Sequence, residues 1–326
     1  MNVLGIETSC DETAAAVVKD GRAVLSNIIS STLYLHKQYG GVVPEIAARG
    51  HLEAIDIVVR RALKDAGLSL SNIDLIALTC QPGLPGALLV GQAFAKALSF
   101  SLNLPLIEVD HTLAHIYAPF LDAKEKEDMP EFPFVGLVVS GGHTSLFYFK
   151  SFKEFKLLGQ TRDDAIGEAF DKVGKILEFS YPGGPEIDRL AKRIDKTRLH
   201  FSCARLGDSF DFSFSGIKTA VLYFVRDWQT KQNKKSLPLK LKMEIAKAFQ
   251  DSVVEVIIAK SISACKNKQV NNLVLGGGVA ANSLLRKKMP LIAQKEKIRV
   301  YFARQSFCLD NAAMVAGLGY QMRRGK

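Results

Sequence analysis

The sequence contains one strand–turn–strand pattern twice, with about 130 residues between equivalent positions. In the first copy, residues 3–8 and 13–18 are apolar segments on either side of an acidic turn. In the second copy, residues 134–139 and 144–149 flank a turn of Ser, Gly, Gly and His. Each copy is typical of a β-hairpin with polar groups at its tip. Alternating helical and strand patterns follow each hairpin, so we expect an α/β protein with two lobes of similar plan and not one continuous sheet.

Further elements follow from hydrophobic periodicity and from capping residues. Strands are expected at residues 74–80, 106–109 and 273–275. Helices are expected at residues 45–66, 87–102 and 164–177, over about 20 residues ending at Lys260, and from starts near His111, Asn282 and Asp310.

Residues 124–133 are charged and contain two prolines, which indicates a linker between the lobes. The expected domains are therefore residues 1–123 together with 310–326, and residues 134–309. The first would carry a histidine pair, and the second would carry glycine-rich loops and most of the basic charge.

Charge is distributed unevenly along the chain. Residues 1–150 contain 11 basic and 16 acidic side chains, whereas residues 151–326 contain 32 basic and 17 acidic ones. The basic residues lie among apolar periodic segments, so the positive charge belongs to a folded surface. Such an asymmetry favours a polyanionic partner, for which the basic loop at residues 231–238 is a candidate contact. A solvated basic face is the alternative.

The remaining composition excludes several classes of protein. The five cysteines are widely spaced and include no C-x-x-C pair, which argues against a disulfide framework or a zinc ribbon. The N-terminal residues lack the pattern of a signal peptide. No window reaches the roughly 18 consecutive apolar residues of a membrane span. We therefore expect a cytoplasmic protein that makes no membrane contact.

His111 and His115 are four residues apart at the start of a predicted helix. Both imidazoles would lie on one helical face, from which they can bind a single metal ion. Asp310 is a candidate third ligand, although it is equally a natural helix N-cap. Two surface histidines are the alternative reading of the pair. A metalloprotease would need Glu in an H-E-x-x-H motif, but position 112 is Thr.

Two glycine-rich loops could bind an anion through their backbone N–H groups. One is the hairpin tip at residues 140–144, and the other, at residues 276–278, lies between a strand and a helix. Neither a G-x-G-x-x-G motif nor a P-loop is present, and tight turns are the alternative. Two hairpins and a strand–glycine–helix segment instead resemble the layout of the actin, heat-shock chaperone and sugar-kinase class (ASKHA), in which two lobes enclose a nucleotide.

Several carboxylates are candidates for chemistry. Asp11 and Glu12, at the first hairpin tip, could accept a proton from an attacking amine. Asp171 and Asp188 could accept hydrogen bonds from ribose hydroxyls, and the neighbouring Lys172 could contact phosphate. In each case a solvated side chain is the alternative.

A series of motifs occurs in the order found in one family. The motifs lie at residues 5–13, 40–45, 82–91, 111–115, 140–144, 167–172, 181–185, 211–216 and 277–282. On these motifs, which span nearly the whole chain, the sequence closely resembles the TsaD family of tRNA threonylcarbamoyladenosine synthases, once described as glycoproteases. Small departures occur at Gln81, Pro85 and Asp110, where the family commonly has other residues.

The resemblance implies an ASKHA fold and an acyl transfer. The threonylcarbamoyl group of L-threonylcarbamoyl-AMP would pass to the exocyclic amine of the adenosine 3′ to the anticodon in tRNA, with release of AMP. The implied ligands of one divalent metal, with iron(II) favoured and zinc possible, are His111, His115 and Asp310. The implied adenylate contacts, which would also accept ATP, ADP or AMP, are Val138, Val139, Ser140, Gly141, Gly142, His143, Asp171, Gly184, Asp188 and Asn282. Candidate catalytic residues are Asp11, Glu12 and His143.

The resemblance also implies partners, namely tRNA, a TsaB-like paralogue that forms a heterodimer and a small TsaE-like ATPase. The residues by themselves are compatible with three other functions. These are an ASKHA-type ATPase or small-molecule kinase, a metalloprotease, which the missing Glu disfavours, and a non-catalytic scaffold, which would not need the histidine pair.

Overall fold

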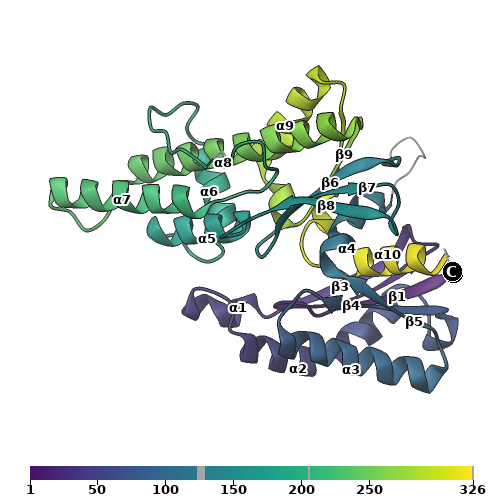
Figure 1. Ribbon diagram of the computed structural model, residues 1–326. Helices are drawn as coiled ribbons and strands as arrows, with labels where there is room; N and C mark the ends of the chain where they lie inside the picture. Colours follow the sequence, from purple (N-terminus) through teal and green to yellow (C-terminus); the bar gives the residue numbers. More distant parts are fainter. Residues whose placement is uncertain (123–128, 205, 325–326) are drawn as a thin grey trace. The chain divides into compact units, whose positions relative to one another are not determined.

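The computed structural model describes residues 1–122, 129–204 and 206–324 (Figure 1). The chain divides into two compact units. Unit 1 consists of Met1–Pro130 and Ala303–Lys326, and unit 2 consists of Glu131–Phe302. Residues 303–309, which the sequence places in the second lobe, group with unit 1 in the structure. Residues 124–128 of the expected linker lie outside the described residues.

Unit 1 is built on a five-stranded sheet in the order β3-β2-β1-β4-β5. The strands are β1 (Asn2–Glu7), β2 (Glu12–Lys19), β3 (Ala23–Ser31), β4 (Leu75–Gln81) and β5 (Leu106–Asp110). β2 is antiparallel to β1 and β3, whereas β4 and β5 run parallel to β1. The helices are α1 (Leu33–His36), α2 (Pro44–Asp65), α3 (Pro85–Leu102), α4 (His111–Tyr117) and α10 (Ala312–Arg324).

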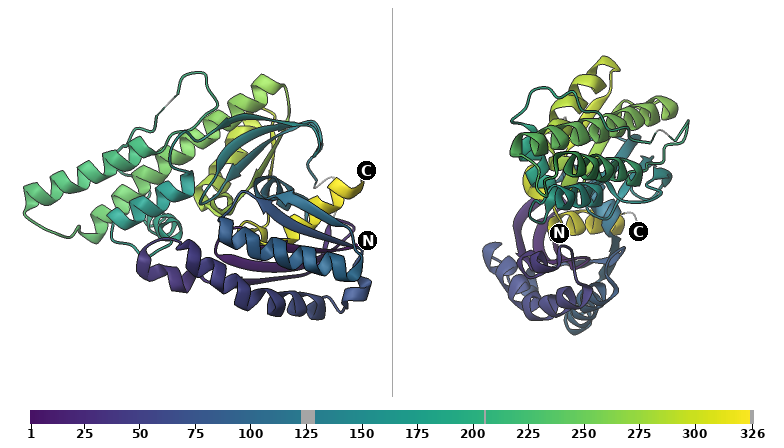
Figure 2. Two further views of the ribbon diagram at one scale, coloured as in Figure 1. Left: turned by 60° about the horizontal axis from the view of Figure 1, so that its bottom comes forward. Right: turned by 90° about the vertical axis from the view of Figure 1, so that its left-hand side faces the viewer.

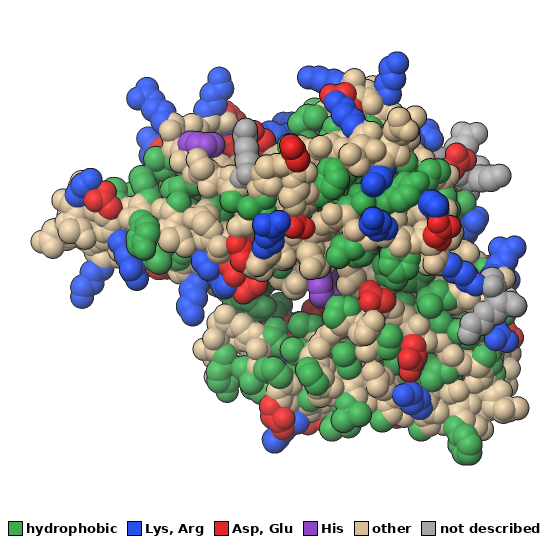
Figure 3. Space-filling model, in the orientation of Figure 1, with side chains coloured by type: hydrophobic (Ala, Val, Ile, Leu, Met, Phe, Trp, Pro, Cys, Tyr) green, Lys and Arg blue, Asp and Glu red, His purple; other side chains and the backbone are tan. Residues whose placement is uncertain are grey.

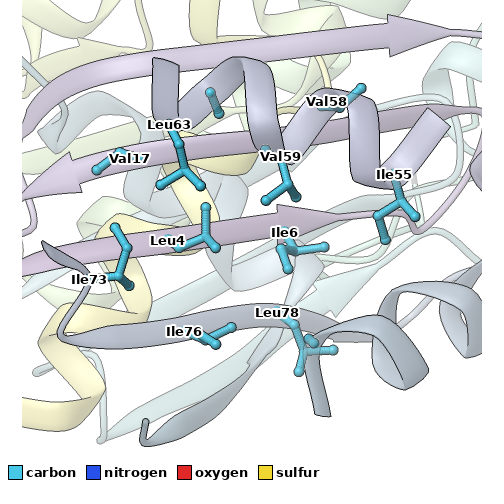
Figure 4. Close-up of a cluster of buried hydrophobic side chains, with 13 residues drawn as sticks. Leu4, Ile6, Val17, Ile55, Val58, Val59, Leu63, Ile73, Ile76 and Leu78 are labelled. Atoms are coloured by element: carbon cyan, nitrogen blue, oxygen red, sulfur yellow. The ribbon is translucent and has the colours of Figure 1, made fainter. Parts of the chain in front are cut away.

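Strand β1 explains why helices pack on both faces of this sheet. Its alternate residues Leu4 and Ile6 point toward α2 and join the buried cluster of Figure 4. Gly5 points to the opposite face, where α10 packs. A Cβ on Gly5 would lie 2.2 Å from the carbonyl oxygen of Ala312. The close approach of α10 to the sheet therefore depends on the absence of a side chain at residue 5.

Unit 2 is built on a second five-stranded sheet in the order β10-β9-β6-β7-β8. The strands are β6 (Phe134–Val139), β7 (Thr144–Phe149), β8 (Phe155–Gln160), β9 (Asn272–Gly276) and β10 (Arg299–Phe302). The helices are α5 (Ile166–Ile176), α6 (Gly183–Ala191), α7 (Ser215–Gln232), α8 (Leu239–Lys268) and α9 (Ser283–Lys295). Figures 1 and 2 show α7 and α8 side by side, and both extend beyond the edge of this sheet.

The two sheets share one topology. When the order in unit 2 is read from the opposite edge, β8-β7-β6-β9-β10 corresponds strand for strand to β3-β2-β1-β4-β5. The prediction of two hairpin-led α/β lobes of similar plan is therefore confirmed. In each unit the structure adds a third antiparallel strand, β3 or β8, that the sequence analysis does not include.

Two expectations for the basic half need correction. Helix α8 has 30 residues and ends at Lys268, because Ile262, Ala264 and Cys265 continue its buried face beyond Lys260. Lys231 lies in the last turn of α7 and not in the loop that follows. Among the described residues, no helix is long and apolar enough to cross a membrane.

Candidate functional site

Three side chains that are distant in sequence meet in unit 1. The Nε2 atoms of His111 and His115 lie 3.5 and 3.1 Å from Oδ1 of Asp310. One ligand atom from each residue lies within 4.8 Å of the other two. Two imidazoles and a carboxylate can bind one divalent cation and leave further positions open for a substrate.

Helix α4 places the two histidines. Strand β5 ends at Asp110, whose carboxylate accepts a hydrogen bond from the backbone N–H of Leu113 at 3.0 Å and so caps the helix. His111 is the first helical residue, and His115 follows one turn later on the same face. Their ring centroids are 4.6 Å apart, with the ring planes at 78°.

Asp310 reaches the histidines because α10 packs closely against the sheet at Gly5. The sequence leaves open whether Asp310 is a ligand or the N-cap of this helix. In the structure Asn311 takes the capping position, since its side-chain oxygen accepts a hydrogen bond from the backbone N–H of Met314 at 3.1 Å. The carboxylate of Asp310 instead lies beside the two imidazoles.

Glu7, to which the sequence analysis assigns no role, orients His111. It is fully buried, and its Oε2 lies 3.0 Å from His111 Nδ1. Ser9 and Thr79 also donate hydrogen bonds to its carboxylate. Burial disfavours the charged form of His111, but the carboxylates of Asp310 and Glu7 outweigh it and raise the pKa of His111 to about 9. The signal in the sequence is a single acidic residue in an otherwise apolar strand.

His115 provides a test of whether a metal fits. Its side chain is fully buried, and within the described part of the chain Nδ1 has no hydrogen-bond partner, whereas Nε2 lies 3.1 Å from Asp310 Oδ1 without hydrogen-bond geometry. Burial also lowers the pKa of His115, which favours the neutral imidazole. A buried, neutral imidazole whose nitrogens lack well-formed hydrogen bonds is costly unless something binds it. The donor set of two imidazoles and one carboxylate therefore fits a divalent metal.

The tip of the first hairpin brings further carboxylates to the same end of unit 1. Asp11 is buried and Glu12 is half-buried. Burial, reinforced by the charges of Asp310 and Asp11, raises the pKa of Glu12 to about 9. In this state Glu12 is protonated at neutral pH and does not accept a proton. His51 anchors the tip, since its two ring nitrogens contact Thr13 Oγ1 at 2.7 Å and the carbonyl oxygen of Cys10 at 3.1 Å.

In unit 2, the turn between β6 and β7 is held in place by hydrogen bonds within the turn and by one from helix α5. Ser140 Oγ accepts a hydrogen bond from the backbone N–H of His143, and the Ser140 carbonyl accepts one from Gly167 at the start of α5. Gly141 and Gly142 are exposed, and among the described residues their N–H groups make no hydrogen bond. The turn therefore presents free donors to an anion. His143 is half-buried.

The preceding residues Val138 and Val139 are fully buried. The second glycine-rich loop lies against them, because a Cβ on Gly277, which has φ of +95°, would fall 2.4 Å from the Val139 carbonyl oxygen. Both loops of unit 2 thus meet where β6 and β9 end.

The other expected adenylate residues lie on helices α5 and α6 of unit 2 or at the start of α9. Asp171, on α5, accepts hydrogen bonds from the backbone N–H groups of Gly183 and Gly184 at the start of α6, and burial raises its pKa. Asp188, on α6, accepts a hydrogen bond from Ser283 Oγ at 2.6 Å and lies 2.9 Å from the ammonium of Lys192.

Asn282 caps α9, since its side-chain oxygen accepts hydrogen bonds from the backbone N–H groups of Leu284 and Leu285. Lys172 is engaged in ion pairs with Asp164 at 2.6 Å and Glu168 at 2.8 Å. These two carboxylates compete with any phosphate for Lys172, so the structure gives no support to a phosphate contact there.

Comparison with known proteins shows the family of this chain. The family model described as "TsaD: tRNA N6-adenosine threonylcarbamoyltransferase" matches residues 23–317. The chain belongs to the TsaD family. Curated relatives named tRNA N6-adenosine threonylcarbamoyltransferase include a protein of Syntrophus aciditrophicus (strain SB), 49% identical over 100% of this chain and 94% of its own length. Another, from Thermosipho africanus (strain TCF52B), is 49% identical over 99% of this chain and 94% of its own length.

Solved structures with much lower identity share the fold. HypF of T. kodakarensis has a TM-score of 0.63 at 15% identity and covers 99% of this chain and 48% of that chain. Component A of the Acidaminococcus fermentans (R)-2-hydroxyglutaryl-CoA dehydratase has a TM-score of 0.56 at 12% identity and covers 99% of both chains. These likenesses confirm the ASKHA fold and carry no functional argument. Membership of the TsaD family, in contrast, implies a nucleotide substrate, a divalent metal and tRNA as the acceptor.

Proposed function

We propose that this protein transfers the threonylcarbamoyl group of L-threonylcarbamoyl-AMP to the exocyclic amine of the adenosine 3′ to the anticodon in tRNA. The observation that carries the proposal is the cluster of His111, His115 and Asp310 in a chain of the TsaD family. The family membership indicates the reaction, and the cluster supplies a centre for its chemistry.

The reaction needs positioning and charge stabilisation more than it needs a nucleophilic side chain. The carbamoyl carbon of the donor is bonded to a phosphate oxygen, so it is already activated. The adenosine nitrogen forms a bond to this carbon, the bond to the phosphate oxygen breaks, and AMP leaves with the electron pair. The amine loses one proton to a base. Groups that bind the leaving phosphate and hold the two reactants together therefore supply most of the rate.

The metal-binding residues in this proposal are His111, His115 and Asp310, and iron(II) is the favoured ion, with zinc as the alternative. When bound, a divalent metal supplies Lewis acidity toward a carbonyl or phosphate oxygen. Glu7 holds Nδ1 of His111 and thereby leaves Nε2 directed at the metal position. The amine proton would pass to the hairpin tip, where Asp11 is the candidate acceptor, because the raised pKa of Glu12 keeps that residue protonated at neutral pH.

The adenylate residues of the proposal belong to unit 2. The backbone N–H groups of Gly141 and Gly142 would bind the phosphate, with His143 beside them. Asp171, Gly184 and Asp188 would bind the ribose, because two half-buried carboxylates on the neighbouring helices α5 and α6 are suitable acceptors for vicinal hydroxyls. Asn282 would contact the nucleotide from the start of α9.

The proposal also includes protein partners and a location. A TsaB-like paralogue and a TsaE-like ATPase are proposed on the family resemblance, together with a cytoplasmic location. The outer faces of α2 and α3 expose apolar side chains suited to a protein partner, namely Leu52, Ile57, Leu89 and Phe100. Co-purification of a paralogue with the tagged chain would support the heterodimer, and recovery of the chain alone would argue against it.

Mass spectrometry of tRNA nucleosides tests the function. Depletion of this chain in its own cells should remove threonylcarbamoyladenosine from tRNA, and re-expression should restore it. An unchanged amount of the modified nucleoside would overturn the proposal. ATP hydrolysis by the purified chain at the same rate with and without tRNA would instead favour an ASKHA-type ATPase.

A further inference from the structure

The Asn282 side chain is held from two directions. Its oxygen accepts hydrogen bonds from the backbone N–H groups of Leu284 and Leu285, both at 3.1 Å. Its nitrogen donates a hydrogen bond to Oε1 of Gln250 at 3.0 Å. In the described part of the chain, the second N–H of this amide has no hydrogen-bond partner.

Gln250 is placed for this contact by the longest helix of unit 2. It lies on α8, is 3% exposed, and its neighbour Phe249 packs edge-to-face against Phe170 of α5. Burying a glutamine costs free energy unless its amide is hydrogen-bonded. Here the bond ties α8 to the start of α9.

We propose that Gln250 is a positioning residue that fixes the Asn282 amide so that its second N–H is directed at the adenylate. This inference rests on the proposed function, in which Asn282 contacts the nucleotide. An amide has one oxygen and one NH₂ group. With the oxygen turned to the α9 backbone and one N–H held by Gln250, rotation of the amide is blocked and the remaining N–H has a fixed direction. A fixed donor binds a ligand more tightly because less freedom is lost on binding.

The test is AMP binding to the purified full-length chain, measured by calorimetry, together with the KM and kcat of the transfer reaction. Gln250→Met removes the acceptor but keeps the side-chain length, and it should weaken AMP binding and raise the donor KM by about 3- to 10-fold, the range expected for one neutral hydrogen bond. Because the effect is on binding, kcat should change much less than KM. Gln250→Glu, which retains an acceptor oxygen, should bind AMP more tightly than Gln250→Met.

A matched control is Ser261→Ala, which removes another buried hydrogen bond of α8, from Ser261 Oγ to the carbonyl oxygen of Ile257. It should leave AMP affinity at the wild-type value. In an Asn282→Ala background, Gln250→Met should have no further effect on AMP affinity, because Gln250 acts through Asn282. Wild-type affinity in Gln250→Met, or additive effects in the double variant, would overturn the inference.

The same measurements separate this inference from the proposed function. If the wild-type chain binds AMP but transfers nothing to tRNA when its partner proteins are supplied, the proposed function is contradicted, and the AMP affinities of the variants still test the role of Gln250. A wild-type chain that does not bind AMP contradicts the adenylate site and, with it, the role of Gln250.

Discussion

Glu7 places a buried carboxylate beside the candidate metal centre. Its carboxylate accepts hydrogen bonds from Ser9 and Thr79 and lies 3.0 Å from Nδ1 of His111. A carboxylate behind a metal-binding imidazole fixes the ring orientation and increases the basicity of the nitrogen that faces the metal. Glu7 is therefore expected to matter for metal affinity even though it is not a ligand.

Glu7→Gln keeps the shape of the side chain and removes its charge. Loss of such an outer partner should weaken binding of Zn²⁺ or Fe²⁺ by about 10- to 100-fold, measured by titration of the metal-free chain. The matched control is Glu154→Gln, an exposed carboxylate paired with Lys150 in unit 2, which should retain wild-type affinity. Equal metal affinity in both folded variants would show that Glu7 has no part in the site.

At the scale of elements, the site depends on how closely α10 packs on β1. Asp310 lies just before this helix, and Asn311 caps it. At Gly5 the helix approaches the strand so closely that no side chain fits between them. Packing of one helix thus determines whether Asp310 reaches His111 and His115.

Gly5→Ala should push α10 away from the sheet. Overpacking of this kind costs about 1–3 kcal/mol, measured by urea unfolding, and it should also weaken metal binding because Asp310 moves with the helix. Gly41→Ala is the comparison, since a Cβ there meets no atom within 4 Å, and its stability should stay within about 0.5 kcal/mol of wild type. Unaltered stability of Gly5→Ala would contradict the packing argument.

Much of this fold is predictable from local patterns, and the reasons for the failures are physical. Alternation and turn residues predict both hairpins, because those signals are confined to a few neighbouring residues. Residues 199–216 show no periodicity in the sequence, and in the structure residues 213–215 are held by a distant partner. Asp163 accepts hydrogen bonds from the side chains of Ser213 and Ser215 and from the backbone of Phe214.

The candidate site, like the fold, is only partly predictable from the sequence. The spacing of His111 and His115 predicts their shared face, because both lie on one helix. The resemblance, and not the spacing, points to Asp310 as their partner. Glu7 and Gln250 could not be assigned from sequence, since their roles depend on contacts across 104 and 32 residues of chain.

At the scale of the whole molecule, the uneven charge follows the division into units. Unit 2 contains 29 basic and 17 acidic side chains, whereas unit 1 contains 14 basic and 16 acidic ones. On the face shown in Figure 3, Lys and Arg side chains project from the region of α7 and α8. The basic excess is thus a property of the unit that carries the proposed adenylate residues, which suits a tRNA substrate.

Neutralising Lys231, Lys234 and Lys235 should weaken tRNA binding. Each lost phosphate contact should also reduce the slope of log affinity against log salt by about 0.7 to 0.9. Fluorescence of Trp228, the single tryptophan, can report binding because it lies on α7 close to these lysines. Neutralising Lys19, Lys64 and Lys96 in unit 1 is the charge-matched control. An unchanged salt slope in the first variant would show that residues 231–235 form a solvated surface and do not contact tRNA.

The central claim is that the histidine pair serves threonylcarbamoyl transfer to tRNA. The most direct measurement is the amount of threonylcarbamoyladenosine formed from purified L-threonylcarbamoyl-AMP and tRNA, with any required partner proteins supplied equally. The wild-type chain and the control His200→Ala, an exposed histidine of unit 2, should both form the modified nucleoside. The double variant His111→Ala, His115→Ala should form none. Full activity of the folded double variant would contradict the account.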